Sequence, residues 1–381
     1  MSVRPHVFIL SSVHDWQDTR IFHKEAVSLA KYFEVELHAP ADFEFHREGN
    51  VSVHGLPRWD TVRDRRILRK ELKRRVRRSQ ADVFHLHDPE LIPLGFYIKL
   101  IRRRKVIFDL HENVGQTILT KKWLPVLLRR LVFFVYKILE KTAARCFDQI
   151  IIAETSYGKF ITHNVTEVLN YPLIDQRLEI PPEVPVQQTI DVIYIGDVTM
   201  QRGVFSMLEA ASLLAESIEN FNMLIIGQIR DGLENRINDF LEEKGLSDSV
   251  SFTGRLPYPR AMQKLDSARV GLATLLPHGN YLESIPTKVL EYMFHGVPFV
   301  ASNFPYWSSF LASDNAGVFV NPNDSVEIAA AVGSILSDPQ LAKALSSNGR
   351  QAVRQKYNWK QEEMKLLECY QNITGRKFDI S

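Results

Sequence analysis

The stretch Glu283–Ser302 reads E-S-I-P-T-K-V-L-E-Y-M-F-H-G-V-P-F-V-A-S and predicts a polar loop, a helix and a short strand in succession. Apolar residues recur at helical spacing, and Pro286 occupies the first turn, where its missing N–H has no cost. Gly296 ends the helix, and the apolar run 297–301 suits a buried parallel strand. A loop that leads into a helix N-terminus presents free N–H groups and the positive dipole end, so this stretch predicts an anion site.

Two charged residues on this helix suit a nucleotide diphosphate. Lys288 places a cation in the first turn, and Glu291 offers a carboxylate that can accept two hydrogen bonds from a ribose diol. Two other glutamate pairs have the spacing of Glu283 and Glu291, at 36 and 44 and at 234 and 242, so the spacing alone is not specific. An amphipathic helix with two incidental carboxylates is the alternative interpretation.

In its loop–helix–strand context, the stretch resembles the Glu-x7-Glu signature of the retaining GT-B glycosyltransferases of family 4, the glycosyl transferases group 1. The resemblance implies that Glu283 contacts the donor sugar and that Glu291 binds the ribose. The implied diphosphate contacts are the backbone amides of Ser284, Ile285 and Thr287, together with Lys288.

Length and composition favour a two-domain, cytosolic protein. The chain has 381 residues, more than one core usually supports, and is 45% hydrophobic and 24% charged. No segment approaches eighteen uninterrupted apolar residues, and the N-terminus lacks a signal-peptide pattern. Cys146 and Cys369 are too few for a disulfide framework or a zinc site, so we expect reduced thiols.

The net charge of +2 conceals an uneven distribution. Residues 1–175 carry 29 Lys and Arg against 21 Asp and Glu, a net charge of +8, and the remainder carries 18 against 24, a net charge of −6. A basic first half is expected if it faces an anionic surface or acceptor.

Strand-like runs alternate with helical patterns through the first half, which predicts a parallel sheet covered by helices on both faces. The predicted strands are His6–Ser11, Val35–Ala39, Val51–His54, Val83–His87, Lys105–Leu110 and Gln149–Ala153. Ligands of such sheets lie beyond the carboxyl ends of the strands. Those ends carry three polar clusters, Ser11–Arg20, His85–Asp88 and His111–Asn113.

The histidines in these clusters have several interpretations. Histidines at strand ends can be packing residues or metal ligands, although nothing in the pattern fixes a metal geometry. The family resemblance of K-V-I-F-D-L-H implies that His111 contacts the donor sugar, and that H-L-H-D, with His87, shapes the cleft. Members commonly have a Gly-Gly pair in the first loop, whereas this chain has no glycine before Gly49. Its acceptor loop would therefore act through the side chains of Asp15, Asp18 and Arg20.

Two basic stretches lie in the first half. Residues 63–78 form a predicted helix with ten Lys or Arg, and residues 121–141 form a more apolar helix that begins near Trp123. A solvated face and a core helix are the ordinary interpretations. Together the stretches resemble an interfacial helix beside a polybasic patch, which attracts a protein to anionic leaflets. No nucleic-acid-binding motif accompanies them, so we expect a membrane surface and no nucleic acid as the partner.

The Pro-rich segment 173–189 is the predicted linker between domains 1–172 and 190–358. Strands are expected at Asp191–Ile195, Met223–Ile226, Val250–Thr253, Val270–Leu275 and Phe299–Ser302, with a helix at Val204–Ile218. No G-x-G occurs, which disfavours a dinucleotide-binding dehydrogenase. No Asp-x-Asp occurs either, which argues against metal-chelating GT-A enzymes and for metal-independent handling of the diphosphate, with no cofactor.

The loop Gly196–Gly203 resembles the family's donor-phosphate loop, in which an Arg and a Lys clamp the phosphates. Arg202 fills the second position, whereas Asp197 stands where the Arg is often found, and Lys288 is the substitute that we expect. The run F-T-G-R-L-P-Y resembles the strand end that holds the nucleobase, at Gly254 and Arg255.

Together these features predict a GT-B fold, with two doubly wound domains facing across a cleft and a last helix, within 359–381, that crosses back to the first domain. The implied reaction is retaining sugar transfer from a nucleotide diphosphate sugar, UDP rather than GDP, to a lipid-linked or polysaccharide acceptor. The protein would be cytoplasmic and peripheral on the inner membrane face. The alternatives are a sugar-nucleotide 2-epimerase and a catalytically silent coat or surface protein; the sequence leaves the donor base, the sugar, the acceptor and the oligomeric state open.

Overall fold

The computed structural model describes residues 4–59, 61–111, 115, 118, 125–161, 163–173 and 189–379. The chain forms two compact units, Met1–Asn170 with Trp359–Ser381, and Tyr171–Asn358. Most of the predicted linker 173–189 and the residues 119–124, with Trp123, lie outside the described residues.

The first unit is built on an eight-stranded sheet of order β3-β4-β2-β1-β5-β6-β7-β8. All neighbouring strands are parallel except β3 and β4. The strands are β1 (His6–Leu10), β2 (Glu34–Pro40), β3 (Phe45–Glu48), β4 (Val51–Leu56), β5 (Val83–Leu86), β6 (Lys105–Leu110), β7 (Gln149–Ile152) and β8 (Val165–Glu167). The six predicted strands are all present. The sequence patterns missed β3 and β8, which are short edge strands with mostly exposed or half-buried residues.

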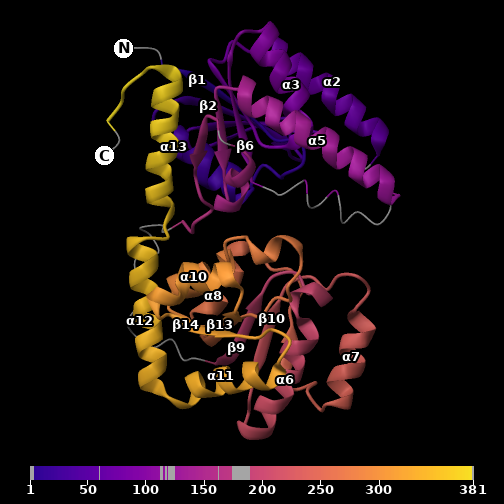
Figure 1. Ribbon diagram of the computed structural model, residues 1–381, viewed down its shortest axis with the longest axis vertical. Helices are drawn as coiled ribbons and strands as arrows, with labels where there is room; N and C mark the ends of the chain where they lie inside the picture. Colours follow the sequence, from indigo (N-terminus) through magenta and orange to yellow (C-terminus); the bar gives the residue numbers. More distant parts are fainter. Residues whose placement is uncertain are drawn as a thin grey trace. The chain divides into compact units, whose positions relative to one another are not determined.

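Helices of the first unit pack on the apolar side chains that these strands present, such as Phe8, Phe84 and Phe108. The helices are η1 (Thr19–Ala26), α1 (Val27–Leu29), α2 (Val62–Arg78), η2 (Pro89–Leu91), α3 (Ile92–Phe96), η3 (Tyr97–Ile101), α5 (Val126–Cys146), η4 (Thr155–Phe160) and α13 (Trp359–Thr374). In Figure 1, α2, α3 and α5 gather on one side of the sheet. The predicted helix 121–141 is described from residue 126 and continues to 146.

The last helix, α13, belongs to the first unit although it follows the second in sequence, as predicted (Figure 1). At its start, Trp359 Nε1 donates a 2.9 Å hydrogen bond to Ser28 Oγ, and Glu362 accepts one of 2.7 Å from the N–H of Leu169. Further along, the Tyr370 hydroxyl shares a 3.0 Å hydrogen bond with His85 Nδ1. These buried contacts join the helix to three separate segments of the unit.

The second unit has a parallel six-stranded sheet of order β11-β10-β9-β12-β13-β14. The strands are β9 (Ile190–Ile195), β10 (Met223–Ile226), β11 (Val250–Phe252), β12 (Ala268–Ala273), β13 (Phe299–Ser302) and β14 (Gly317–Val320). The predictions missed only β14 among them. The helices are η6 (Met200–Arg202), α6 (Val204–Ser217), α7 (Glu234–Glu243), α8 (Tyr258–Leu265), η7 (Gly279–Leu282), α9 (Thr287–His295), α10 (Pro305–Leu311), η8 (Ala312–Asp314), α11 (Ser325–Ser337) and α12 (Pro339–Gln355).

Each unit contains a largely parallel sheet with helices packed on it, the first formed by the first half of the chain and the second by the second half. The sequence predicts this architecture. The first strand of each unit, β1 or β9, lies in the interior of its sheet and has further strands on either side. Such an order creates a switch point at the carboxyl ends of the central strands, where ligands of doubly wound sheets bind.

Candidate active site

In the second unit, the loop after β9 brings backbone and cations together. Gly196 has φ 142° and Gly203 has φ 74°, conformations that favour glycine. Between them, Thr199 Oγ1 accepts a 3.2 Å hydrogen bond from the N–H of Arg202 and so begins the short helix η6. Gly203 then starts α6, and a Cβ there would lie 2.3 Å from the carbonyl oxygen of Thr274. The two glycines are therefore required by the fold of this loop.

Arg202 and Lys288 converge on Gly196, from η6 and α9 respectively. A Cβ on Gly196 would lie 2.7 Å from Arg202 Nη1 and 3.1 Å from Lys288 Nζ. The structure thus brings together the two cations that the sequence assigned to the diphosphate. Only a residue without a side chain leaves both cations next to the backbone at the end of β9.

The ammonium group of Lys288 is buried and has no hydrogen-bond partner among the described residues. It lies 4.2 Å from the centroid of the Tyr194 ring, which provides a cation–π contact. Burial, with the nearby guanidinium of Arg202, holds the pKa of Lys288 well below its usual value, against the opposing charges of Glu291 and Asp197. A buried cation beside a second cation is a site in need of an anion.

The segment around α9 has the predicted form. Pro286 precedes the first helical residue, and Gly296, with φ 70°, ends the helix. Trp307 Nε1 donates a 2.8 Å hydrogen bond to the carbonyl of Ser284, which fixes the loop. Glu283 is exposed, Ser284 is half-buried and Ile285 is buried. The N–H of Thr287 donates to the carbonyl of Ile285 at 2.9 Å, so this amide is already used within the turn.

Glu291 and the predicted base-binding segment meet through a residue that the sequence analysis did not single out. Tyr258, at the start of α8, donates a 3.3 Å hydrogen bond from its hydroxyl to Glu291 Oε1 while its ring is half exposed. Gly254 has φ 67°, and its carbonyl accepts a 2.9 Å hydrogen bond from the N–H of Gly227. Arg255 is exposed beside it. The exposed ring of Tyr258 lies next to Glu291, the carboxylate predicted to bind the ribose. An aromatic ring can stack on a nucleobase, which the backbone of Gly254 alone cannot do.

In the first unit, side chains from two other segments hold the loop Ser11–Arg20 in place. Asp88, after β5, accepts hydrogen bonds from the N–H of Ser12 at 2.5 Å and the hydroxyl of Ser11 at 3.1 Å. Trp59 Nε1 donates to the carbonyl of Ser12 at 2.9 Å. The loop is therefore held from two neighbouring segments.

Asp15 lies on the exposed part of this loop, where Arg58 Nη2 donates a 2.7 Å hydrogen bond to it. Asp18 instead caps η1, because its carboxylate accepts from the N–H groups of Arg20 and Ile21. Arg58 was not singled out from the sequence, since it follows β4, more than forty residues from Asp15. Of the predicted acceptor residues, Asp15 alone has an exposed ionic partner of this kind among the described residues.

Arg20 occupies a different place from the one predicted. Its side chain is 4% exposed, and its guanidinium donates two 2.8 Å hydrogen bonds to Asp109 and one of 2.9 Å to the carbonyl of Val168. The cause is the π-helical form of η1, which brings residues five apart onto one face and sets Arg20 beside Glu25, 3.0 Å away. The prediction of an open acceptor-loop arginine is corrected to a buried ion-pair residue.

His111 and His87 flank Asp109 at the end of β6. Asp109 Oδ2 lies 3.1 Å from His87 Nδ1 and 3.3 Å from His111 Nδ1. Burial acts to raise the pKa of Asp109, but Arg20 and the hydrogen bonds from the histidines outweigh it and hold the pKa well below its usual range. His111 is also 3.0 Å from His14, Nε2 to Nε2. His87 is buried, and His111, with a side chain 11% exposed, is the one that opens toward solvent.

Three clusters of His, Asp and Glu are close enough for a metal ion, namely Glu25–His85–His87, His87–Asp109–His111 and Glu36–His38–His54. In the first two, the guanidinium of Arg20 lies 2.8 Å from Asp109 and 3.0 Å from Glu25. Burial, together with Asp109, raises the pKa of Glu25 to about 8 against the effect of Arg20, so Glu25 holds a proton at neutral pH. In the third, Arg75 donates to His38 Nδ1 at 3.1 Å, which leaves the proton on Nε2, the nitrogen facing Glu36. Each cluster therefore already has an ion-pair or hydrogen-bond contact with an arginine.

Comparisons with known proteins agree with this arrangement. Residues 175–352 match the family described as Glycosyl transferases group 1. An alpha-D-kanosaminyltransferase of Streptomyces kanamyceticus is 26% identical over 184 residues, 48% of this chain and 45% of that protein. A phosphatidyl-myo-inositol mannosyltransferase of Mycobacterium leprae is 22% identical over 316 residues, 81% of this chain and 79% of that protein. The chain thus spans less than half of the first relative and about four fifths of the second.

Two solved structures share the fold over nearly the whole chain. Sucrose-phosphate synthase from Thermosynechococcus elongatus has a TM-score of 0.71 at 18% identity, and covers 98% of this chain and 99% of its own. HepE of Anabaena, solved in complex with UDP, has a TM-score of 0.68 at 14% identity, and covers 97% and 100%.

The two sheets and the returning last helix define a GT-B protein, which confirms the predicted fold class. Within that class, residues 175–352 match the glycosyl transferases group 1 family, the retaining family 4 that the sequence resembles.

Proposed function

We propose that this protein is a retaining glycosyltransferase that uses a UDP-sugar as donor. One observation carries the proposal: Lys288 is a buried cation with no hydrogen-bond partner among the described residues, placed with Arg202 against the bare backbone of Gly196. That arrangement fits a diphosphate. The crystal structure of HepE with UDP, on the same fold, favours uracil as the base.

The remaining donor contacts follow from the same unit. Glu291 would bind the ribose, with Tyr258 and the segment 254–255 beside the base, and Glu283 would orient the sugar. In the first unit, His111 would contact the sugar, because it is the strand-end histidine with an exposed edge. These roles are proposals drawn from the family resemblance and from the positions just described.

The reaction breaks the bond between the sugar C1 and the β-phosphate oxygen, and a new bond forms from the acceptor oxygen to C1 on the same face. The acceptor proton passes to the departing phosphate. Negative charge develops on the diphosphate, where Arg202 and Lys288 are already placed, and fixed charges of this kind supply much of an enzyme's acceleration. In the ligand-free protein, Arg202 and Lys288 repel each other. A bound diphosphate offsets this repulsion, so the affinity for the donor should depend on its diphosphate.

Thermal unfolding with a panel of UDP, GDP and ADP, each with and without a linked sugar, tests the donor site. A ligand at 100 times its dissociation constant stabilises the fold by about 2.7 kcal/mol. We expect UDP to raise the midpoint, and Glu291→Ala to abolish the rise. A protein that responds to no nucleotide would instead support a silent coat or surface role.

The stereochemistry of the product separates the two enzyme classes. Proton NMR of the anomeric signal should show that the configuration of the donor is kept in the transferred sugar. Conversion of the free UDP-sugar to its 2-epimer, in the absence of any acceptor, would identify an epimerase instead.

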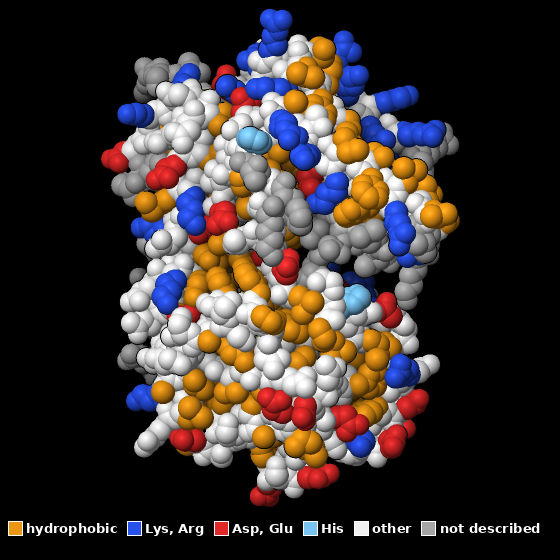
Figure 2. Space-filling view, viewed as in Figure 1, with side chains coloured by type: hydrophobic (Ala, Val, Ile, Leu, Met, Phe, Trp, Pro, Cys, Tyr) orange, Lys and Arg blue, Asp and Glu red, His pale blue; other side chains and the backbone are white. Residues whose placement is uncertain are grey.

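We further propose that the acceptor is lipid-linked and that α5 lies on an anionic membrane surface. A stripe of apolar residues along α5 is exposed, with Leu127 at 81%, Phe134 at 63% and Ile138 at 65%. The rest of the exposed stripe is Leu128, Leu131, Val132, Val135 and Leu139. Figure 2 shows apolar and basic side chains interleaved over this part of the first unit.

Charge supports the same surface. The neighbouring helix α2 ends in Arg75, Arg77 and Arg78 and contains only two acidic residues, Asp64 and Glu71. Basic residues near an anionic leaflet each contribute about 1 kcal/mol of attraction. A relative named for a phosphatidyl-inositol acceptor aligns with most of the chain. None of the described helices is long and apolar enough to cross a membrane, so contact would be at the interface.

Flotation with vesicles tests this surface. The protein should float with vesicles that contain phosphatidylglycerol but not with pure phosphatidylcholine, and Phe134→Glu with Ile138→Glu should prevent flotation. Val326→Glu is the control, because Val326 is equally exposed, at 65%, but lies on α11 in the other unit. Equal flotation of all variants would contradict the proposal.

A further inference from the structure

The loops after β9 and β10 continue side by side beyond the strand ends. The N–H of Gly196 donates to the carbonyl of Ile226 at 2.8 Å, the N–H of Val198 to Gln228 at 2.9 Å, and the N–H of Arg230 back to Val198 at 3.0 Å. Gly227 allows the close approach, since a Cβ there would lie 1.8 Å from the carbonyl oxygen of Gly196. Arg230 is therefore fixed in backbone register beside the candidate phosphate loop.

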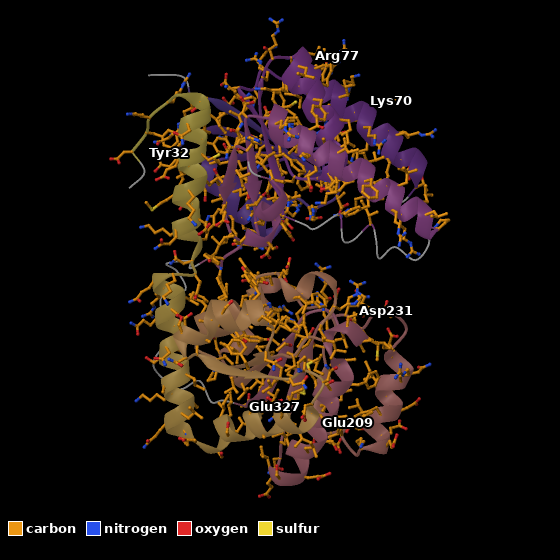
Figure 3. All side chains as sticks on the ribbon, viewed as in Figure 1. Tyr32, Lys70, Arg77, Glu209, Asp231 and Glu327 are labelled. Atoms are coloured by element: carbon orange, nitrogen blue, oxygen red, sulfur yellow. The ribbon has the colours of Figure 1, made fainter. Side chains whose placement is uncertain are left out.

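The side chains of these loops form one ion pair. Arg230 Nε lies 3.4 Å from Asp197 Oδ2, and the two side chains are 45% and 43% exposed. Asp231 and Gly232, with φ 60° and 67°, then turn the chain into α7. Figure 3 labels Asp231, the neighbour of Arg230, in this turn at one end of α7.

Asp197 follows Gly196, at the position where the family that this loop resembles often has an arginine. A carboxylate next to a diphosphate site is unfavourable by itself, because like charges repel. The structure places the guanidinium of Arg230 beside that carboxylate, with Nε 3.4 Å from Asp197 Oδ2. The missing cation is thus present, but it comes from another loop.

We propose that Arg230 is a diphosphate-binding residue and that Asp197 is its positioning residue. This inference rests on the proposed donor function and extends it. The guanidinium keeps N–H groups that Asp197 does not occupy, and these can donate to phosphate oxygens. Lys288 and Arg202 would then bind the diphosphate from one side of Gly196, and Arg230 from the side of β10.

The alternative, that the pair is an ordinary surface salt bridge, predicts the opposite sign for one variant. If Asp197 only adds negative charge near the site, Asp197→Ala should tighten the binding of a diphosphate. If Asp197 positions Arg230, the same substitution should weaken binding, although it removes a negative charge. The two interpretations therefore differ in direction and not only in size.

Isothermal titration of the full chain with UDP and with uridine tests the inference. We expect Arg230→Ala to weaken UDP binding about tenfold or more and Asp197→Ala to weaken it by a smaller factor, while uridine affinity stays unchanged. Lys244→Ala is the matched control, since Lys244 and Glu209 form a pair of similar exposure at 3.5 Å. Figure 3 shows Glu209 well away from Asp231.

Four results would overturn the inference. UDP affinity within twofold of wild type in Arg230→Ala, or tighter binding by Asp197→Ala, would do so while the donor site stands. A parallel loss of uridine affinity would show that the loop as a whole had moved. If the wild-type protein binds UDP and GDP no better than uridine, the donor function fails, and this inference fails with it.

Discussion

The guanidinium of Arg20 holds the carboxylate of Asp109 through two hydrogen bonds of 2.8 Å, and both side chains are almost completely buried. The pair joins the π-helix η1 to the end of β6, and Asp109 in turn contacts His87 and His111. A residue expected in an acceptor loop is thus part of the support for the candidate sugar-contacting histidine.

Removing one partner of this pair should be strongly destabilising. Arg20→Met leaves the Asp109 charge buried without its main cation, and we expect a loss of about 3–5 kcal/mol in the free energy of unfolding. The double variant Arg20→Met with Asp109→Asn should recover part of that loss, because no uncompensated charge remains. Urea denaturation measures both. A single variant within 1 kcal/mol of wild type would show that the pair is not a structural support.

The stability of the first unit should depend on pH through His111. Burial acts to lower the pKa of His111, but the contact with Asp109 and its charge outweigh burial and raise the pKa from 6.5 to about 9. Because the folded pKa lies above the unfolded one, this stabilisation is complete below about pH 6.5 and is lost as the pH rises through about 9.

The measurement is the free energy of unfolding of wild type and His111→Gln between pH 6 and 9.5. We expect the difference between the two proteins to be largest at the acid end and to shrink toward pH 9.5. Glu25, with a pKa raised to about 8, changes stability in the same direction, and the charge of His111 acts to lower that pKa.

Local patterns predicted most of the fold, and the failures have physical causes. Strands β6 and β13 contain buried apolar runs, at 106–108 and 299–301, which the sequence indicates directly. Strands β3 and β8 lie at sheet edges with little burial, so their composition is that of a loop. The burial of Arg20 depends on Asp109, 89 residues away, which no local pattern contains.

The candidate donor site likewise contains residues that local sequence patterns predicted and residues that they did not. Glu283, Lys288 and Glu291 lie within one loop and helix, so the local motif, taken with its loop–helix–strand context, was sufficient to find them. Arg230 and Tyr258 come from loops after other strands and join the site only through the order of the sheet. The sequence indicates these two residues only by where they stand, which is after strand ends that should face the ligand.

Lys288 should show opposite effects on stability and on binding. Its buried ammonium lowers the stability of the ligand-free protein, so Lys288→Met is expected to leave the thermal midpoint unchanged or to raise it. The same variant should bind UDP at least about tenfold more weakly, because a charge-assisted contact to phosphate is lost. Thermal unfolding and calorimetry of the same preparations measure both. A midpoint well below that of wild type would mean that Lys288 stabilises the fold rather than the ligand.

Gly196→Ala should remove donor binding by displacing cations rather than by unfolding the protein. The added Cβ would lie 2.7 Å from Arg202 Nη1 and 3.1 Å from Lys288 Nζ, at a φ of 142° that side chains rarely adopt. We expect UDP affinity to fall more than about tenfold, with a loss of stability of about 1 kcal/mol. Gly245→Ala is the matched control, since it has φ 63° but no atom within 4 Å of its Cβ, and it should lose stability without losing affinity. Equal affinities for the two variants would indicate that the space beside Gly196 is not where the diphosphate binds.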